Sequence, residues 1–192
     1  IRVGGLVSGL IMFQVVLLSL MGANNAAREV AGERLILEKE KFSGLSPWAF
    51  VASRVAFLAG LVLVQSVWMG FFVNSIIGMP GSLFIQVLLL VLVNASMTAI
   101  SLGISSVMRT AEQSSLVSVY LVGFQLPLSG AVLALPEWLG RATRPLIASY
   151  WGWSGYLQTL QETRFYQAVV TMTQTPLVSV SVAVWVLLCH SA

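Results

Sequence analysis

Long apolar stretches that carry almost no charge dominate the sequence and restrict the chain to one class of fold. Four of them lie between polar breaks, at residues 3–21, 48–74, 83–107 and 114–135. A helix needs roughly 20 apolar residues to cross a hydrocarbon core of about 30 Å. Because backbone groups in lipid must be hydrogen-bonded within the chain, these stretches predict membrane-spanning α-helices.

A fifth apolar run, residues 177–190, predicts a further span that is cut at the chain end. We therefore expect a single all-α integral membrane domain over residues 1–192, with about five transmembrane helices. Only 9% of the residues are charged, which excludes an ordinary soluble domain because such domains carry about 25%. The chain begins with Ile1, and its first apolar run is long and has no small-residue cleavage site, so we do not interpret that run as a signal peptide. We interpret the chain as a fragment of something longer.

The composition changes between the first two spans, where eight of the fourteen residues from Arg28 to Lys41 are charged. No proline interrupts this segment, and the residues 44–47 (Gly-Leu-Ser-Pro) favour a stop. Asn24 and Asn25 are suitable helix caps at its start. The pattern predicts a water-exposed helix over residues 26–42.

The charges of this predicted helix fall into two groups. Arg34, Glu38 and Lys41 lie three or four residues apart, where they can neutralise one another. The other carboxylates form a separate acidic stripe without a cation beside it: Glu29, Glu33 and Glu40. Such a stripe is either a solvated face or a docking surface for a basic partner at the membrane edge.

Lysine and arginine residues concentrate on one side of the predicted spans. The loop 22–47 carries four, with Arg54 just inside the next span, and the turn 108–113 carries Arg109. The opposite side carries Arg2, none in the connection 75–82 and three in the long segment 136–176. By the positive-inside rule, this bias predicts that the charged helix and Arg109 face the cytoplasm and that 136–176 lies outside.

The segment 136–176 is rich in aromatic residues, which favour the headgroup level of a membrane. We expect short helices at or dipping into the outer interface, with breaks at Pro136 and Pro145 and close turns at Gly152 and Gly155. An interfacial girdle without a ligand is the simplest role for these aromatic residues: Trp138, Tyr150, Trp151, Trp153, Tyr156, Phe165 and Tyr166.

Within the spans, Ala95, Ala99 and Gly103 repeat at four-residue spacing, a pattern typical of close helix contacts. Pro127 predicts a bend in the span 114–135, which suits either a cavity wall or a plain kink. Apart from Arg54, near the start of the span 48–74, the notable polar residues of the spans are uncharged: Gln14, Gln65, Asn94, Thr98, Ser101, Ser105 and Gln125.

The chain lacks the residues that several common kinds of binding and catalytic site require. Lys39 and Lys41 lie among glutamates and follow no glycine-rich loop, so the chain binds no ATP by itself. Cys189 and His190 are its single Cys and His, which argues against a disulfide, a metal site and a serine hydrolase. The net charge of +3 is too scattered for a nucleic-acid partner. No catalytic residue is visible.

Short motifs follow one another in a definite order along these spans. They are Gly32-Glu33-Arg34 with Glu40 and Gly44, then Leu128-Ser129-Gly130, Pro136-Glu137-Trp138-Leu139 and Glu162-Thr163-Arg164-Phe165. Over about residues 15–190, their order resembles the membrane domain of ATP-binding-cassette (ABC) exporters of the type-2 permease class. The resemblance is to the G-type subfamily (white/pigment and multidrug) in particular.

This resemblance implies a domain of six spans, of which the chain would hold the second to the sixth. It also implies that the segment 26–42 is a coupling helix that rests on a nucleotide-binding domain, fused or separate, which holds ATP and magnesium. The coupling residues that it implies are Glu29, Glu33, Arg34, Glu40 and Gly44.

The resemblance further implies that two permease domains pair, as a homodimer, around a substrate cavity between the helices matching 3–21 and 114–135. The implied lining residues are Leu18, Met21, Gly123 and Leu126, and the implied outer gate is Gly130, Ala131 and Val132. Because nothing titratable lines this path, we expect an apolar or amphipathic cargo, moved by alternating access across a plasma or inner membrane.

Two other functions stay open at this point. One is a permease-like anchor or assembly subunit that contacts membrane lipid and moves no cargo. The other is a secondary carrier, which is disfavoured because no carboxylate lies within a span and no inverted repeat is visible.

Overall fold

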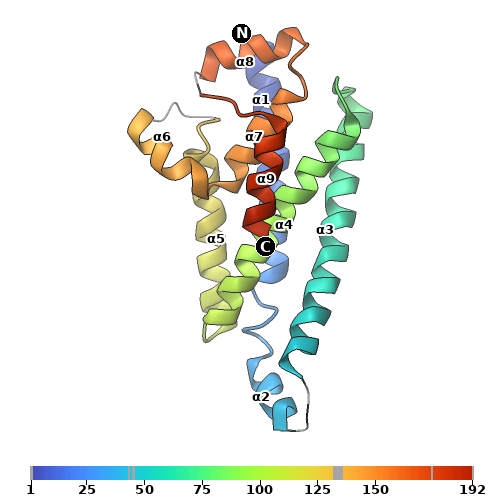
Figure 1. Cartoon of the computed structure of the whole chain (residues 1–192), viewed down its shortest axis with the longest axis vertical. Helices are drawn as coiled ribbons and strands as arrows, with labels where there is room; N and C mark the ends of the chain where they lie inside the picture. The colour runs from blue at the N-terminus through green and yellow to red at the C-terminus, as the bar shows by residue number, and fades with distance from the viewer. Residues whose placement is uncertain (1, 43, 45, 132–135, 174, 192) are drawn as a thin grey trace.

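The computed structural model describes residues 2–42, 44, 46–131, 136–173 and 175–191. These residues form helices and turns, with no strand among them, which confirms the all-α class. Figure 1 shows an elongated bundle with α2 at one end and α8 at the other. The helices are α1 (Arg2–Ala26), α2 (Arg34–Phe42), α3 (Pro47–Ile77), α4 (Leu83–Val107), α5 (Ala111–Leu128), α6 (Glu137–Thr143), α7 (Ala148–Gln158), α8 (Arg164–Thr173) and α9 (Val180–Ser191), with a 3₁₀ turn, η1, at Arg144–Leu146.

Three helices of the described chain, α1, α3 and α4, are long and apolar enough to cross a membrane. They correspond to the predicted spans 3–21, 48–74 and 83–107. The helix α5 ends at Leu128, and residues 132–135 of the span predicted there lie outside the described residues. The helix α9 has only 12 residues. The spans predicted at 114–135 and 177–190 therefore stay predictions.

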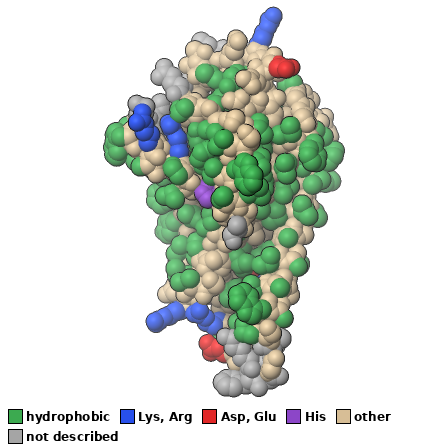
Figure 2. Space-filling model, in the orientation of Figure 1, with side chains coloured by type: hydrophobic (Ala, Val, Ile, Leu, Met, Phe, Trp, Pro, Cys, Tyr) green, Lys and Arg blue, Asp and Glu red, His purple; other side chains and the backbone are tan. Residues whose placement is uncertain are grey.

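The pattern of exposed side chains on α3 indicates whether water or lipid surrounds the bundle. It packs on its neighbours through one narrow stripe of buried residues at four-residue spacing: Leu58, Val62, Ser66 and Gly70. Its other faces expose apolar side chains, such as Trp68 at 72%. Figure 2 shows hydrophobic side chains over most of the flank, with charged side chains gathered mainly toward the two ends. A helix that is apolar all round suits hydrocarbon better than water.

The core lies around α4, which contacts α1, α3, α5, α7 and α9. Its buried side chains Leu89, Leu90, Val93 and Met97 are at most 1% exposed. Because neighbours surround α4 on most of its circumference, about half of it is buried.

The helix α7 lies inside the bundle, where it contacts α1, α4 and α9. Its side chains Tyr150, Trp153 and Tyr156 are 2%, 0% and 3% exposed, so the interfacial girdle predicted for them is wrong because they pack against protein. Gly152 lies within this helix and not in a turn. A Cβ there would come within 2.2 Å of Val93 Cγ2 on α4, so the glycine lets the two helices pack closely. Gly155 is likewise helical and also serves close packing.

The other aromatic residues of this segment lie nearer the surface. Trp138 on α6 is 73% exposed, in keeping with an interfacial residue. Trp151 and Tyr166 are partly buried, and the side chain of Phe165 lies outside the described residues. Pro136 directly precedes α6 and Pro145 lies in η1, so both prolines mark breaks as predicted.

The proline on which the predicted bend of the span 114–135 depends lies close to a helix end. Pro127 lies in the last turn of α5, which ends at Leu128, so the proline is at the end of the helix rather than within a longer one. Gln125 does not face a cavity, because its Oε1 accepts a hydrogen bond from the backbone N–H of Ser149 at 3.0 Å. This bond joins α5 to the start of α7.

The close approach of α1 to α4 uses Gly22. A Cβ at Gly22 would lie 2.5 Å from Asn94 Oδ1 and 2.7 Å from Thr98 Oγ1. By contrast, a Cβ at Gly103 would meet no atom within 4 Å, so the predicted stripe does not make its close helix contact there within the described chain.

This geometry predicts opposite results for two glycine substitutions. Gly22→Ala should destabilise the protein by about 1–3 kcal/mol, because the added methyl overlaps Asn94 and the backbone of α4 cannot easily move away. Gly103→Ala should be neutral or slightly stabilising, because alanine favours helix where space is open. Thermal unfolding in detergent measures both, and an equal midpoint for the two variants would contradict the packing.

Candidate functional site

Residues 27–33, here called the connector, join α1 to α2 through hydrogen-bonded turns. The predicted helix 26–42 is therefore wrong over its first half, since α1 ends at Ala26 and α2 begins at Arg34. The reason is a hydroxyl on α4: Ser105 Oγ accepts the N–H groups of Val30 and Ala31, at 3.1 and 3.0 Å. In a continuous helix these groups would bond to carbonyls four residues earlier.

The asparagines that precede the connector do not cap a new helix, because both lie within α1. Asn25 Nδ2 donates to Gln65 Oε1 on α3 at 3.2 Å. Asn94 Nδ2 on α4 donates to the same oxygen at 3.3 Å and to Ser66 Oγ at 3.2 Å. These amides join α1, α3 and α4 next to the connector.

Arg54, in the second turn of α3, binds the connector through two carboxylates. Its Nη1 lies 3.3 Å from Glu29 Oε2, and its Nη2 contacts Glu33 Oε2. The guanidinium also lies 5.2 Å from the centre of the Phe50 ring. The prediction of an acidic stripe without a cation is therefore wrong for Glu29 and Glu33, because the cation comes from the next helix.

Arg34, the first residue of α2, turns toward α4 in the structure. Its guanidinium donates to the carbonyls of Ser106 at 3.0 Å and Met108 at 3.3 Å, rather than neutralising Glu38 as predicted. The last carbonyls of a helix carry partial negative charge, so a cation is favourable there. These bonds bring the charged segment and the turn at Arg109 to one end of the bundle, as predicted.

The helix α2 presents apolar side chains at this charged end. Leu35 is 75% exposed and Ile36 is 55% exposed, and Glu38 and Lys39 beside them are exposed as well. Gly44 follows with a φ of +93°, a conformation that favours glycine and helps to end the segment. The side chains of Glu40 and Lys41 lie outside the described residues.

A comparison with protein families decides the class of this chain. The family described as ABC-2 type transporter matches residues 3–161, which is more than half of the chain. The chain belongs to the ABC-2 type transporter family. A search of curated proteins finds no match. The membership confirms the type-2 permease class, and with the apolar spans it identifies an integral membrane protein.

Three of the four residues predicted to line a substrate cavity in this ABC-2 transporter domain are at its surface. Met21 on α1 is 36% exposed, Leu126 on α5 is 39% exposed, and Gly123 is exposed as well. Leu18 is 0% exposed and faces the core of the chain. The helices α1 and α5 contact each other, so the exposed residues flank one helix pair.

The predicted outer gate lies just beyond α5. Gly130 is buried with a φ of +73°, and its carbonyl accepts a hydrogen bond from Thr175 Oγ1 at 2.9 Å. The N–H of Ala131 donates to Ser129 Oγ at 3.2 Å. Val132 lies outside the described residues. The start of the predicted gate is therefore held by hydrogen bonds.

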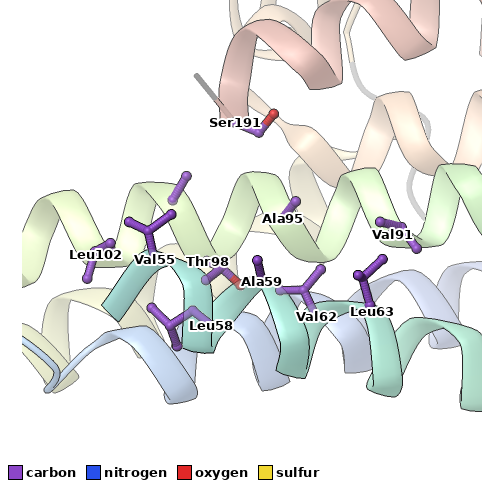
Figure 3. Close-up of a pocket in the computed structure, with 11 residues that line it drawn as sticks. Val55, Leu58, Ala59, Val62, Leu63, Val91, Ala95, Thr98, Leu102 and Ser191 are labelled. Carbon is purple, nitrogen blue, oxygen red and sulfur yellow. The ribbon is translucent and has the colours of Figure 1, made fainter. Parts of the chain in front are cut away.

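A cavity of about 590 Å³ opens between α3 and α4 of the ABC-2 domain. The side chains of the two helices face a common space, and Ser191 of α9 lies beside it (Figure 3). The hydroxyl of Thr98 donates to Asn94 O and that of Ser191 to Leu188 O, so both donors are already used. The remaining lining residues are apolar: Val55, Leu58, Ala59, Val62, Leu63, Val91, Ala95, Ala99 and Leu102.

Sequence reasoning missed three features of the charged end. It treated Ser105 as an ordinary polar residue of a span and Arg54 as a contribution to the charge bias, and it gave no role to Leu35 and Ile36. Arg54 carried a usable signal, because a lone arginine inside a predicted span needs a partner. No local pattern points to Ser105, since its partners lie 74 and 75 residues away.

Arg54→Ala should loosen the connector. The three side chains are between 21% and 36% exposed, so the loss in stability should be about 0.2–1 kcal/mol. Proteolysis within residues 27–33 should be faster, because Glu29 and Glu33 lose their partner. Limited proteolysis in detergent measures this, with Arg109→Ala in the exposed turn after α4 as the control. Equal cleavage rates in the two variants would contradict the role of Arg54.

Proposed function

We propose that the chain is the permease part of an ATP-driven exporter and that α2 docks on an ATP-binding cassette domain, fused or separate. The exposure of Leu35 and Ile36 carries this proposal. They project from a short helix at the charged end of the bundle. Exposed apolar side chains with charged neighbours are typical of protein-binding surfaces, in which a few such residues supply most of the affinity.

The division of charges supports different roles within the coupling segment. Glu29 and Glu33 are bound by Arg54, and Arg34 is bound to α4, so these residues position α2. The exposed Glu38, and Glu40 two residues further along the chain, are the carboxylates that would meet basic side chains on the partner. Such pairs fix the orientation of a docked surface more than they add affinity. ATP and magnesium would bind on the partner domain and not on this chain.

The substrate path follows from the family and from the exposed residues. Two permease domains would pair so that Met21, Gly123 and Leu126 face a shared cavity. No titratable group lines these positions, which favours an apolar or amphipathic cargo. With the charged end in the cytoplasm, as the positive-inside rule favours, cargo would leave at the α6–α8 end. The order of the motifs supports membership of the G-type subfamily.

Truncating the exposed apolar side chains of α2 should weaken docking of the ATPase partner without affecting the folding of the permease. The double variant Leu35→Ala/Ile36→Ala should bind the ATPase partner about 30-fold more weakly, if each truncation costs about 1 kcal/mol. ATP-dependent transport in proteoliposomes should fall with it. Val64→Ala is the matched control, because Val64 is 69% exposed on the apolar flank of α3.

The outcomes of this experiment distinguish the proposal from its rivals. Transport that needs no ATP would indicate a secondary carrier. Binding of the ATPase without any ATP-dependent transport would indicate an anchor or assembly subunit. Unchanged binding in the double variant would place the docking surface somewhere other than α2.

A further inference from the structure

The helix α4 forms side-chain hydrogen bonds with the neighbouring helices α3, α7 and α9. Ser96 Oγ donates to the carbonyl of Leu187 on α9 at 3.0 Å. Gln86 Oε1 accepts from the hydroxyl of Tyr156 on α7 at 3.2 Å. Asn94 donates to Gln65 and Ser66 on α3. These bonds and its apolar packing connect α4 to the rest of the core. A movement of α4 would therefore be passed on to the helices around it.

Ser105 connects this helix to the connector. It is 0% exposed, and its Oγ accepts two backbone N–H groups, from Val30 and Ala31. A hydroxyl oxygen has two lone pairs, so both acceptor positions are occupied. If the connector moved away from α4, two N–H groups would lose their acceptor at a buried site, which is unfavourable.

The contact between the connector and α3 is of a different kind. The ion pairs of Arg54 with Glu29 and Glu33 are between 21% and 36% exposed, so water can replace them when they open. The carbonyls of Ser106 and Met108 add a second anchor on α4 through Arg34. The connector is therefore held more firmly to α4 than to α3.

We propose that Ser105 is a positioning residue that ties α2 to α4, so that a displacement of α2 enters the core through α4. This inference rests on the proposed docking of α2 on an ATPase domain. The connector and the C-terminal end of α4 move together, while the contact with α3 opens and closes. The helices α7 and α9 follow α4 through the bonds of Gln86 and Ser96.

The first test compares neighbouring serines in the assembled transporter, with its ATPase domain, in proteoliposomes. Ser105→Ala should keep ATP hydrolysis but lower the amount transported per ATP at least fivefold. Ser106→Ala is the matched control, because Ser106 is exposed and its Oγ donates only to Gly103 O in its own helix. Ser105→Thr keeps an acceptor oxygen and should restore most of the coupling.

The second test measures the proposed movement directly. Spin labels at Lys39→Cys on α2 and Val107→Cys on α4, both exposed, in a Cys189→Ser background, report the distance between the two helices. With Ser105 in place, the distance should stay the same between the nucleotide-free and ATP-trapped states. With Ser105→Ala, the distribution should broaden or shift when ATP is trapped.

Each result bears on a different statement. If the unsubstituted protein shows no ATP-dependent transport, the proposed function fails. If it transports, but Ser105→Ala behaves as Ser106→Ala does, or the distance from α2 to α4 changes on ATP binding with Ser105 in place, the role of Ser105 is overturned. The distance measurement on the Ser105 protein decides the question even where Ser105→Ala does not fold.

Discussion

Polar groups within a membrane domain have few partners other than the protein itself, and this constraint shapes the charged end of the bundle. The guanidinium of Arg54 lies at the start of a long apolar helix and binds the carboxylates of the connector. The amides of Asn25, Gln65 and Asn94 bind one another across three helices. Where α1 leaves the bundle, Ser105 takes two N–H groups of the connector, and the chain cannot continue as one helix. Satisfying these groups fixes where α2 begins and which way it points.

As a consequence, α2 is a short exposed helix whose first end is attached to the bundle. The connector is held on one side by Arg54 from α3 and on the other by Ser105 and the end of α4. The exposed side of α2 carries Leu35 and Ile36. Within the described chain, no neighbouring residue covers these two side chains fully. A partner that binds this side acts on a segment that is tied to the central helix. The ABC-2 family generally combines its membrane domains with ATP-binding cassette subunits, which agrees with this arrangement.

Apolar length and charge bias were enough to predict the helical membrane class, the three longest helices and the grouping of the charged segment with the turn at Arg109. Local pattern failed where a distant residue decides the outcome. The helix expected over 26–42 is broken by a serine on α4, and the aromatic residues Tyr150, Trp153 and Tyr156 lie in the core because Gly152 and Gly155 let α7 approach α4. In each case the deciding contact joins segments far apart in sequence, which no periodicity or capping pattern records. The candidate site was found in outline, but its charge pairs were assigned within one helix instead of between helices.

The central claim is that α2 is the surface on which the ATPase domain docks. Hydrogen–deuterium exchange of the membrane-embedded protein, with the ATPase domain bound and after its removal, tests this most directly. Binding should slow exchange in residues 34–42, while exchange in the segment 136–173 at the opposite end should be unaffected. Slower exchange at the opposite end, or unchanged exchange in α2, would contradict docking at α2.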